Sequence, residues 1–523
     1  MKRIITLVCF VLLTASISPL AVAAKDLKLR VTPPAPKFTD AERQAELARR
    51  RAAVAAKMAD NSVMILFSAQ PRLYTNDVDY VYRQENNLYY LTGLKQNNAT
   101  LVIAKTGGGI SETLFIPKRN PLRETWDGKM YSRDDVTRLS GIRSIADSTE
   151  QDAMLTALKG RSAFNSKDGA VSVGAFSTIY LLLPQDSPDR PDEIGHREYR
   201  AEHDFSQSLK DYKIENAQPI FAALRLIKSP YELKVLQHAI DISTEAQMRS
   251  MATVGRMKWE YELQAEVEYT FRRRNADFWG YPSIVGCGPS STTLHYVESQ
   301  APVKSGELVL MDVGAEYDHY TADVTRTFPV NGKFSKEQAE IYQIVYDAQE
   351  AVATATRPGV SFQQLNKIAR DKINDGLLRL GLITEKNTEQ SRVWFMHGLG
   401  HWLGMNVHDV GDYLTPLRAG MVFTNEPGIY IREDALDNLP NTPAMQAFKK
   451  KVRPVFEKYK NIGVRIEDDL LVTDSGVVWM TKNLPRSIAD IEAFMSTGPK
   501  QVTLSRRLNE SLKQNVFLAA AGL

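Results

Sequence analysis

Two aspartates inside an apolar double strand constrain the fold of this chain more than any other feature. The stretch LVLMDVGAEYDHYTADVTRTFPV, residues 308–330, has two β-branched and apolar runs around the polar AEYDHY, which predicts a β-hairpin. With a turn centred on Tyr317 and Asp318, Asp312 lies opposite Asp323, with Cβ atoms about 4.5–5.5 Å apart. Two like charges on a buried face are unfavourable unless a cation or a shared proton compensates for them. The alternatives are a different register or an aspartate that points to solvent.

Two glutamates later in the chain are embedded in a similar way. Glu426 ends the strand-like MVFTNEP, and Glu467 lies among the apolar residues of NIGVRIEDDLLVT. A buried carboxylate is rarely left without a partner. We therefore expect Glu467 to pair either with a metal ion or with Arg465 or Arg326.

Histidines gather in one glycine-rich stretch, MHGLGHWLGMNVHDVG, residues 396–411, which holds three of the eight in the chain. His397 and His401 are four residues apart, as in helical H-E-x-x-H zinc sites, but no glutamate follows His397. The glycines of this stretch disfavour a helix. We expect a loop that brings His397, His401 and His408 close to a ligand.

The donor set is four carboxylates with one or more imidazoles and no thiolate. Such a set suits Mn²⁺, Co²⁺ or Zn²⁺. One divalent ion would leave excess negative charge, whereas two ions about 3.5–4 Å apart would balance it, and a hydroxide bridging them could act as nucleophile. The residues favour a hydrolytic two-metal site.

The length of 523 residues favours two domains. In the first half, a charged helix is expected near residues 40–59, and NSVMILFSA, LYYLTG, ATLVIAK and ETLFIPK each predict a strand, so this half is predicted to be an α/β domain. Ser229 and Pro230 begin a helix, and helices then alternate with antiparallel strand pairs, which predicts an α+β domain. The expected division is a signal peptide at 1–24, domains at 38–225 and 226–497, and a tail at 498–523.

Residues 1–24 have the form of a secretory signal peptide, with Lys2 and Arg3 before an apolar core and the small-residue pattern Ala21-Val22-Ala23 after it. That core is too short to span a bilayer, and no other apolar run is long enough. We expect an exported chain, periplasmic or secreted, with no stable membrane span after cleavage and with Cys287 as its single cysteine. The net charge of +3, with no basic stretch interleaved with aromatics, argues against a nucleic-acid partner.

The acids and the histidine loop resemble a known family, the pita-bread metallopeptidases, which include methionine aminopeptidase, aminopeptidase P and prolidase. The matching stretches are MDVGAEYDHYTADVTRT, HGLGHWLGMNVHD, NEPGIY and GVRIEDD, in that order. YPSIVGCGPSSTTLHY and KSPYELKVLQHA also look like segments of the catalytic domain. YVYRQENNLYYLTG and ETWDGKM are similar to the N-terminal domain that aminopeptidase P and prolidase share. The resemblance implies an α/β N-terminal domain followed by an α+β pita-bread (creatinase/aminopeptidase) catalytic domain.

The resemblance also implies the metal ligands. Asp323 and Glu467 would bridge two divalent ions, Asp312 would complete one site, and His401 with Glu426 the other. Mn²⁺ is the preferred metal, with Co²⁺ or Zn²⁺ as alternatives. The hydroxide that bridges the metals would attack the scissile carbonyl, with Glu426 as proton acceptor.

Substrate contacts are implied for three histidines. His295 and His408 would contact the substrate and stabilise the tetrahedral intermediate, and His397 would line the pocket near the proline side. Arg465 and Tyr430 match positions that orient the ligands.

The expected function is that of an Xaa-Pro aminopeptidase, which removes the N-terminal residue from peptides with proline in second position. Prolidase, which splits only Xaa-Pro dipeptides, is the alternative, because a long insertion before the final strand also occurs in prolidases. A non-catalytic peptide-binding relative, or a metal-free relative such as creatinase, is disfavoured because all five ligand positions are filled. Relatives are commonly dimers or tetramers, so a homo-oligomer is expected.

Overall fold

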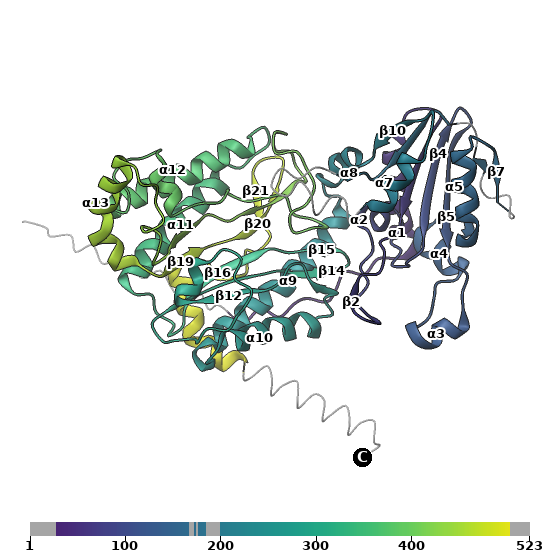
Figure 1. Ribbon diagram of the computed structural model, residues 1–523. Helices are drawn as coiled ribbons and strands as arrows, with labels where there is room; N and C mark the ends of the chain where they lie inside the picture. Colours follow the sequence, from purple (N-terminus) through teal and green to yellow (C-terminus); the bar gives the residue numbers. More distant parts are fainter. Residues whose placement is uncertain (1–27, 167–171, 174–175, 185–198, 503–523) are drawn as a thin grey trace, which may run out of the picture.

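The computed structural model describes residues 28–166, 172–173, 176–184 and 199–502 (Figure 1). The expected signal peptide and residues 503–523 of the expected tail lie outside the described residues. Two bodies of secondary structure stand side by side in Figure 1, one built from the elements up to α8 and the other from α9 onward. In the described part of the chain, no helix is long and apolar enough to cross a membrane.

The first body is built on a six-stranded mixed sheet with the order β10-β9-β1-β4-β5-β6. Every residue of β1 up to Leu66 is buried, as the apolar run NSVMILFSA predicts. Met64 and Leu66 face one apolar cluster and Val63 and Ile65 the other, so the sheet is covered on both sides. The strands are β1 (Ser62–Phe67), β4 (Thr100–Thr106), β5 (Gly109–Ile116), β6 (Ser144–Asp147), β9 (Thr178–Leu181) and β10 (Lys213–Asn216).

Helices cover both faces of this sheet, which confirms the predicted α/β class. The helix predicted near 40–59 begins at Asp40 with a capping box of Thr39 and Glu42. The short helix α3 projects from the body with no buried residue, so Trp126 is 87% exposed. The helices are α1 (Asp40–Lys57), α2 (Asn86–Thr92), α3 (Pro121–Asp127), α4 (Arg133–Ser140), α5 (Gln151–Lys159), α7 (Arg200–Gln207) and α8 (Gln218–Arg225). The first body also contains two small hairpins, β2 (Leu73–Thr75) with β3 (Val78–Asp79) and β7 (Phe164–Asn165) with β8 (Ser172–Val173).

One strand prediction is wrong. LYYLTG falls in α2, whose seven residues are all buried, so the segment has no amphipathic period to distinguish a helix from a strand. The carboxylate of Glu85 accepts a hydrogen bond from the Leu88 amide and caps the helix, and Gly93 ends it with a left-handed φ of 66°.

The second body is α+β, as predicted. Its first helix, α9, begins at Pro230 behind a capping box of Ser229 and Glu232 and is almost wholly buried for its last nineteen residues. The remaining helices are α10 (Glu260–Arg273), α11 (Lys336–Ala355), α12 (Phe362–Leu380) and α13 (Pro443–Tyr459), after α9 (Pro230–Thr253). The strands form sheets β12-β13-β16, β11-β14-β15, β17-β20-β21 and β18-β19. Their bounds are β11 (Phe278–Trp279), β12 (Ile284–Cys287), β13 (Leu308–Val313), β14 (Ala315–Tyr317), β15 (Tyr320–Thr321), β16 (Val324–Pro329), β17 (Val422–Asn425), β18 (Gly428–Ile431), β19 (Ile462–Arg465), β20 (Asp468–Val472) and β21 (Val477–Trp479).

The predicted hairpin of residues 308–330 exists, but the turn lies one residue later than predicted and the pairing is shifted by two residues. The turn lies at Asp318 and His319, both with positive φ, instead of at Tyr317 and Asp318. Asp312 therefore pairs with Thr325, and Asp323 is its diagonal neighbour on the same face. Asn, Asp and His tolerate the left-handed conformation better than most residues, which allows the turn at Asp318 and His319.

Candidate metal centre

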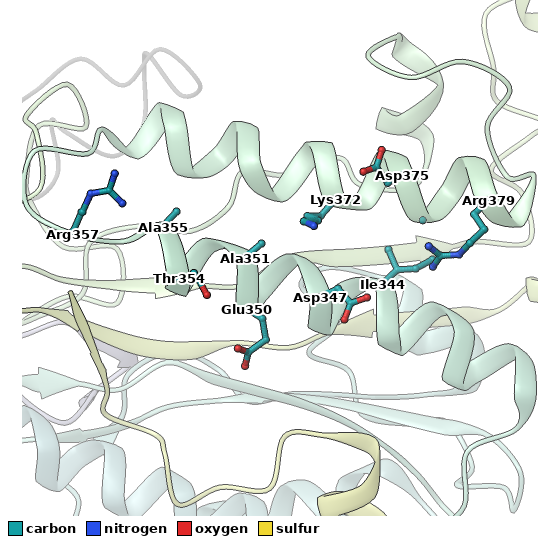
Figure 2. A pocket seen from close by; sticks show the side chains of 11 residues that line it. Ile344, Asp347, Glu350, Ala351, Thr354, Ala355, Arg357, Lys372, Asp375 and Arg379 are labelled. Carbon is teal, nitrogen blue, oxygen red and sulfur yellow. The ribbon is translucent and has the colours of Figure 1, made fainter. Parts of the chain in front are cut away.

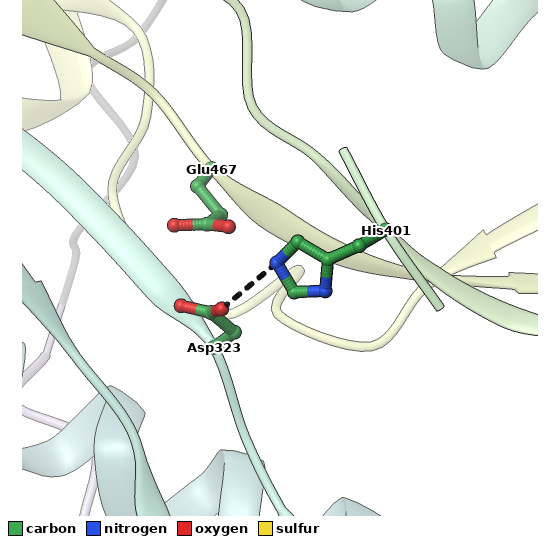
Figure 3. Close-up of side chains that lie close together, drawn as sticks. All are labelled: Asp323, His401 and Glu467. Carbon is green, nitrogen blue, oxygen red and sulfur yellow. Dashed lines mark ion pairs between the residues drawn. The ribbon is translucent and has the colours of Figure 1, made fainter. Parts of the chain in front are cut away.

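Three predicted ligands lie close together, two of them beside strand ends and one in a loop (Figure 3). Asp323 precedes β16, Glu467 lies in the break between β19 and β20, and His401 comes from the loop before β17. One ligand atom from each lies within 4.8 Å of the others. The Nε2 atom of His401 is 3.3 Å from Asp323 Oδ2. Its Nδ1 atom is 3.2 Å from the carbonyl of Trp402, so the N–H on that side donates there and Nε2 faces the carboxylates.

The other two predicted ligands border this group on either side. Glu426 directly follows β17, and its Oε1 atom is 3.3 Å from Nε2 of His401. Asp312, in β13, reaches Asp323 through the hydroxyl of Tyr281, which lies 2.5 Å from a carboxylate oxygen of each aspartate. All five side chains predicted from the sequence as ligands thus lie in one connected group.

The alternative ion pair for Glu467 does not form. Arg465 bonds the carboxylate of Asp312, and Arg326 bonds that of Asp468. The carboxylate of Glu467 accepts a 2.6 Å hydrogen bond from the Thr325 hydroxyl and forms no ion pair with a described residue.

The electrostatics of the group call for added positive charge. Burial and the neighbouring carboxylates raise the pKa of Glu426 to about 7 and the pKa of Glu467 well above its ordinary value. Burial and Asp312 raise the pKa of Asp323. Burial opposes the charged form of His401, but Asp323 and Glu426 outweigh it and raise its pKa to about 9. Burial would also raise the pKa of Asp312, but Arg465 holds it below its usual range.

The donor set therefore fits divalent cations. Three carboxylates whose ionisation is opposed by burial and by one another become stable as anions when cations lie between them. Carboxylate oxygens with one imidazole nitrogen are donors that suit Mn²⁺, Co²⁺ or Zn²⁺. A cluster with a purely structural role would need a proton or an arginine on each acid. Arg465 bonds Asp312 only, and no arginine is bonded to the other three acids in the described part of the chain.

The histidine loop is irregular, as predicted, and its glycines have a packing reason. A Cβ atom on Gly400 would lie 1.9 Å from the carbonyl oxygen of Thr424, and one on Gly404 would lie 2.1 Å from Asp409 Oδ2. These glycines let the loop lie flat against β17 and its own return segment. The amide of Thr424 donates to the carbonyl of His401, which fixes the ligand to the strand.

A chain of hydrogen bonds joins His397 to the acids. The hydroxyl of Tyr430 lies 2.8 Å from His397 Nε2 and accepts a 2.8 Å bond from Arg465, which also bonds Asp312. Burial and Arg465 lower the pKa of His397 to about 3, so the ring is neutral at neutral pH. The Nδ1 atom lies 2.8 Å from the Gly398 carbonyl and is the side that donates.

Two other predicted histidines lie at the edge of the site. The ring of His408 is 4.2 Å from the ring of His401 at 67°, and the side chain of His408 lines a cavity of about 1380 Å³ between the two bodies. Burial, with the charges of His401 and His295, lowers the pKa of His408 to about 4. His295 is exposed, after β12, and it is near enough for its charge to act on His408.

A second cavity, of about 730 Å³, lies between α11 and α12 (Figure 2). Two of its acids already have partners, because Asp375 pairs with Lys386 and Glu350 with Arg486. None of the predicted site residues lines it.

Sequence reasoning missed the residues that hold the ligand strands. The amide of Gln247, on α9, donates to the carbonyls of Met311 and Val324, which adjoin Asp312 and Asp323. The amide of Gln349, on α11, donates to the carbonyls of Asn425 and Ile466, which precede Glu426 and Glu467. Both glutamines are completely buried, and only Gln349 carries a signal in the sequence, as a polar residue on a largely apolar helix face. Tyr281 was also missed, because nothing in its neighbourhood distinguishes it from a packing tyrosine.

Replacing Tyr281 by phenylalanine is expected to weaken metal binding about 10-fold, because the hydroxyl that links Asp312 and Asp323 is lost while the ring remains. Calorimetric titration with Mn²⁺ measures the change. The matched control is Tyr296→Phe, whose hydroxyl bonds Glu260 away from the ligands. Equal affinity in the Tyr281 variant and the wild type would show that the hydroxyl does not orient the ligands.

Comparisons with known proteins agree with this architecture. Residues 234–474 match the family described as metallopeptidase family M24, and residues 47–165 match the aminopeptidase P N-terminal domain. The chain is 36% identical to an Xaa-Pro aminopeptidase of Haemophilus influenzae, covering 86% of this chain and 97% of the relative. It is 33% identical to an Xaa-Pro aminopeptidase of Escherichia coli, covering 87% of this chain and 98% of the relative.

Solved structures give the same result. The structure of proline aminopeptidase P II from Yersinia pestis has a TM-score of 0.72 and 32% identity, covering 87% of this chain and 99% of that one. The structure of aminopeptidase P from E. coli with the inhibitor Pro-Leu has a TM-score of 0.73 and 30% identity, covering 89% and 100%. The chain therefore belongs to metallopeptidase family M24, with an aminopeptidase P N-terminal domain ahead of a pita-bread catalytic domain.

Proposed function

We propose that this protein is an Xaa-Pro aminopeptidase that removes the N-terminal residue from peptides with proline in second position. The observation that carries the proposal is the connected group of five acid and imidazole side chains, which His408 links to a cavity that is large enough for a peptide. The relatives and solved structures whose names specify this activity cover nearly the whole of their own length. Prolidase is not favoured, since these relatives are named as aminopeptidases.

Asp312, Asp323, His401, Glu426 and Glu467 would hold two divalent ions, for which Mn²⁺ is our choice. Ions bound there supply Lewis acidity and lower the pKa of water, which turns it into a nucleophile at neutral pH. Glu426, which lies beside His401, would accept the proton of the attacking water and pass it to the leaving amine. Export of the mature chain and a homo-oligomeric state remain part of the proposal.

Three side chains of this chain would act on the peptide. His408, at the cavity edge, and the exposed His295 would donate hydrogen bonds to the scissile carbonyl as negative charge develops on it. The neutral ring of His397, held by Tyr430, would pack near the proline. The tertiary Xaa-Pro amide has no N–H, so a site for it needs no acceptor at that nitrogen.

A peptide panel tests the substrate class. Xaa-Pro-Yaa tripeptides are expected to lose their first residue with Mn²⁺ present, whereas Xaa-Ala-Yaa peptides are not, and chelator should stop the reaction. Co²⁺ and Zn²⁺ in parallel identify the preferred metal. Cleavage of Xaa-Pro dipeptides with intact tripeptides would instead establish prolidase activity. Sequencing the N-terminus of the protein from a periplasmic fraction tests export, which predicts loss of residues 1–24.

A further inference from the structure

The segment between the metal ligand His401 and the substrate histidine His408 is held by hydrogen bonds from both bodies. The side chain of Arg83 donates to the carbonyl of Met405 at 2.9 Å, and the amide of Asn86 donates to the side chain of Asn406 at 2.7 Å. Both donors belong to the N-terminal body, Arg83 just before α2 and Asn86 as the first residue of that helix.

Asp409, the residue after His408, is the firmest of these attachments. Its side chain is 1% exposed and bonds the guanidinium of Arg225, whose side chain is 3% exposed. Arg225 ends α8, the last helix of the N-terminal body, and its other terminal nitrogen donates to Asn87 on α2 at 2.8 Å. One guanidinium thus joins α2 to the residue beside His408.

Further contacts hold both the backbone and the side chain of Asp409. Its amide donates to the carbonyl of Trp402 at 2.8 Å, and Lys228 Nζ lies 3.6 Å from its Oδ2 atom. Gly404 leaves room for that oxygen, as shown by the 2.1 Å approach that a Cβ atom would make. The side chain of His408, by contrast, is exposed at the cavity edge, so its position depends on where residue 409 is anchored.

We propose that Arg225 and Asp409 are positioning residues that act through His408, so that the N-terminal body sets the geometry of the substrate histidine. The inference rests on the proposed function, because it assigns His408 to the peptide carbonyl. A displacement of about 1 Å at a group that stabilises the transition state lowers the rate by up to about 10²-fold, even though the displaced anchor touches no substrate.

The test is a double-mutant cycle on the full-length enzyme loaded with Mn²⁺, using an Xaa-Pro-Yaa tripeptide. Arg225→Met is expected to lower kcat about 10- to 100-fold with KM changed less than about threefold and with metal content equal to the wild type. In a His408→Ala background, the same substitution is expected to cause no further loss, because both changes remove one contribution. Arg225→Lys, which keeps the charge but reaches only one partner, is expected to recover part of kcat.

Two more variants keep the test decisive. Asn87→Ala removes a neutral side chain two contacts away from His408, so it folds even where Arg225→Met does not, and it is expected to lower kcat about threefold with the same dependence on His408. Arg51→Met is the matched control, since Arg51 is 2% exposed and, among the described residues, bonds only Glu112, Leu91 and Ser140, all within the N-terminal body. Its thermal midpoint is expected to fall while kcat is unchanged.

Equal losses from Arg225→Met, or from Asn87→Ala, with and without His408 would overturn the inference, as would an unchanged kcat in these variants. Failure of the proposed function gives a different result, because the wild-type enzyme would then not cleave the tripeptide.

Discussion

Replacing Asp323 by asparagine is expected to lower kcat/KM about 10³-fold or more and to reduce the metal content of the purified protein. Asp323 contacts His401 on one side and, through Tyr281, Asp312 on the other. Its replacement therefore removes the carboxylate that connects the other ligands. An amide offers one neutral oxygen in place of two charged ones, and divalent ions are then bound weakly. Peptide hydrolysis and elemental analysis measure the two effects.

The same substitution is expected to stabilise the metal-free protein. Burial and Asp312 raise the pKa of Asp323, so ionisation of this carboxyl at pH 7 opposes folding unless cations are bound. We expect the free energy of unfolding of the metal-free variant to exceed that of the metal-free wild type at pH 7. Asp241→Asn, a buried aspartate paired with Arg30 far from the ligands, is the control and should not change metal content. Full activity in the Asp323 variant would contradict the ligand assignment.

Removal of metal by chelation is expected to abolish activity and to change how stability depends on pH. In the metal-free protein, Glu426 has a pKa of about 7 and His401 of about 9, both above their unfolded values. A folded state that binds more protons than the unfolded state loses stability as pH rises. The contribution of these two groups to stability should therefore fall from about pH 4.5 to pH 9 in the metal-free protein, most clearly above about pH 6.5, where the lowered pKa values of His397 and His408 no longer act in the opposite direction.

Bound cations should remove most of this dependence, because metal ions keep the acids ionised and the imidazole neutral in the folded state. Thermal unfolding at intervals of pH, with Mn²⁺ and with chelator, gives the two profiles. The Glu426→Gln variant provides the control, since its metal-free profile should lose the part near pH 7. Parallel profiles with and without metal would contradict the electrostatic account of the site.

Features that depend on short stretches of chain were predictable from the sequence. The start of α9 followed from Ser229 and Pro230, and the loop around His401 followed from its glycines. The connection of acids more than one hundred residues apart came from a physical rule, that buried carboxylates need partners, together with a family resemblance. Neither source gives distances, which is why Asp312 was placed opposite Asp323 and not diagonal to it.

Features that depend on packing across the fold were not predictable. The helix α2 is buried on every side, so its residues carry no period, and its boundaries rest on Glu85 and Gly93. Tyr281 reaches two aspartates only after three strands have come together. The bond from Arg225 to Asp409 crosses between bodies, and no local pattern marks either residue.

The two buried glutamines have a consequence for how this site can evolve. Gln247 and Gln349 hold main-chain carbonyls beside the ligands, so the backbone of each acid pair is set by amide groups that do not touch the ligand side chains. A ligand can therefore be exchanged for another donor while its Cα atom stays in place. The metal preference of the site can therefore change during evolution while the backbone that carries the ligands stays the same.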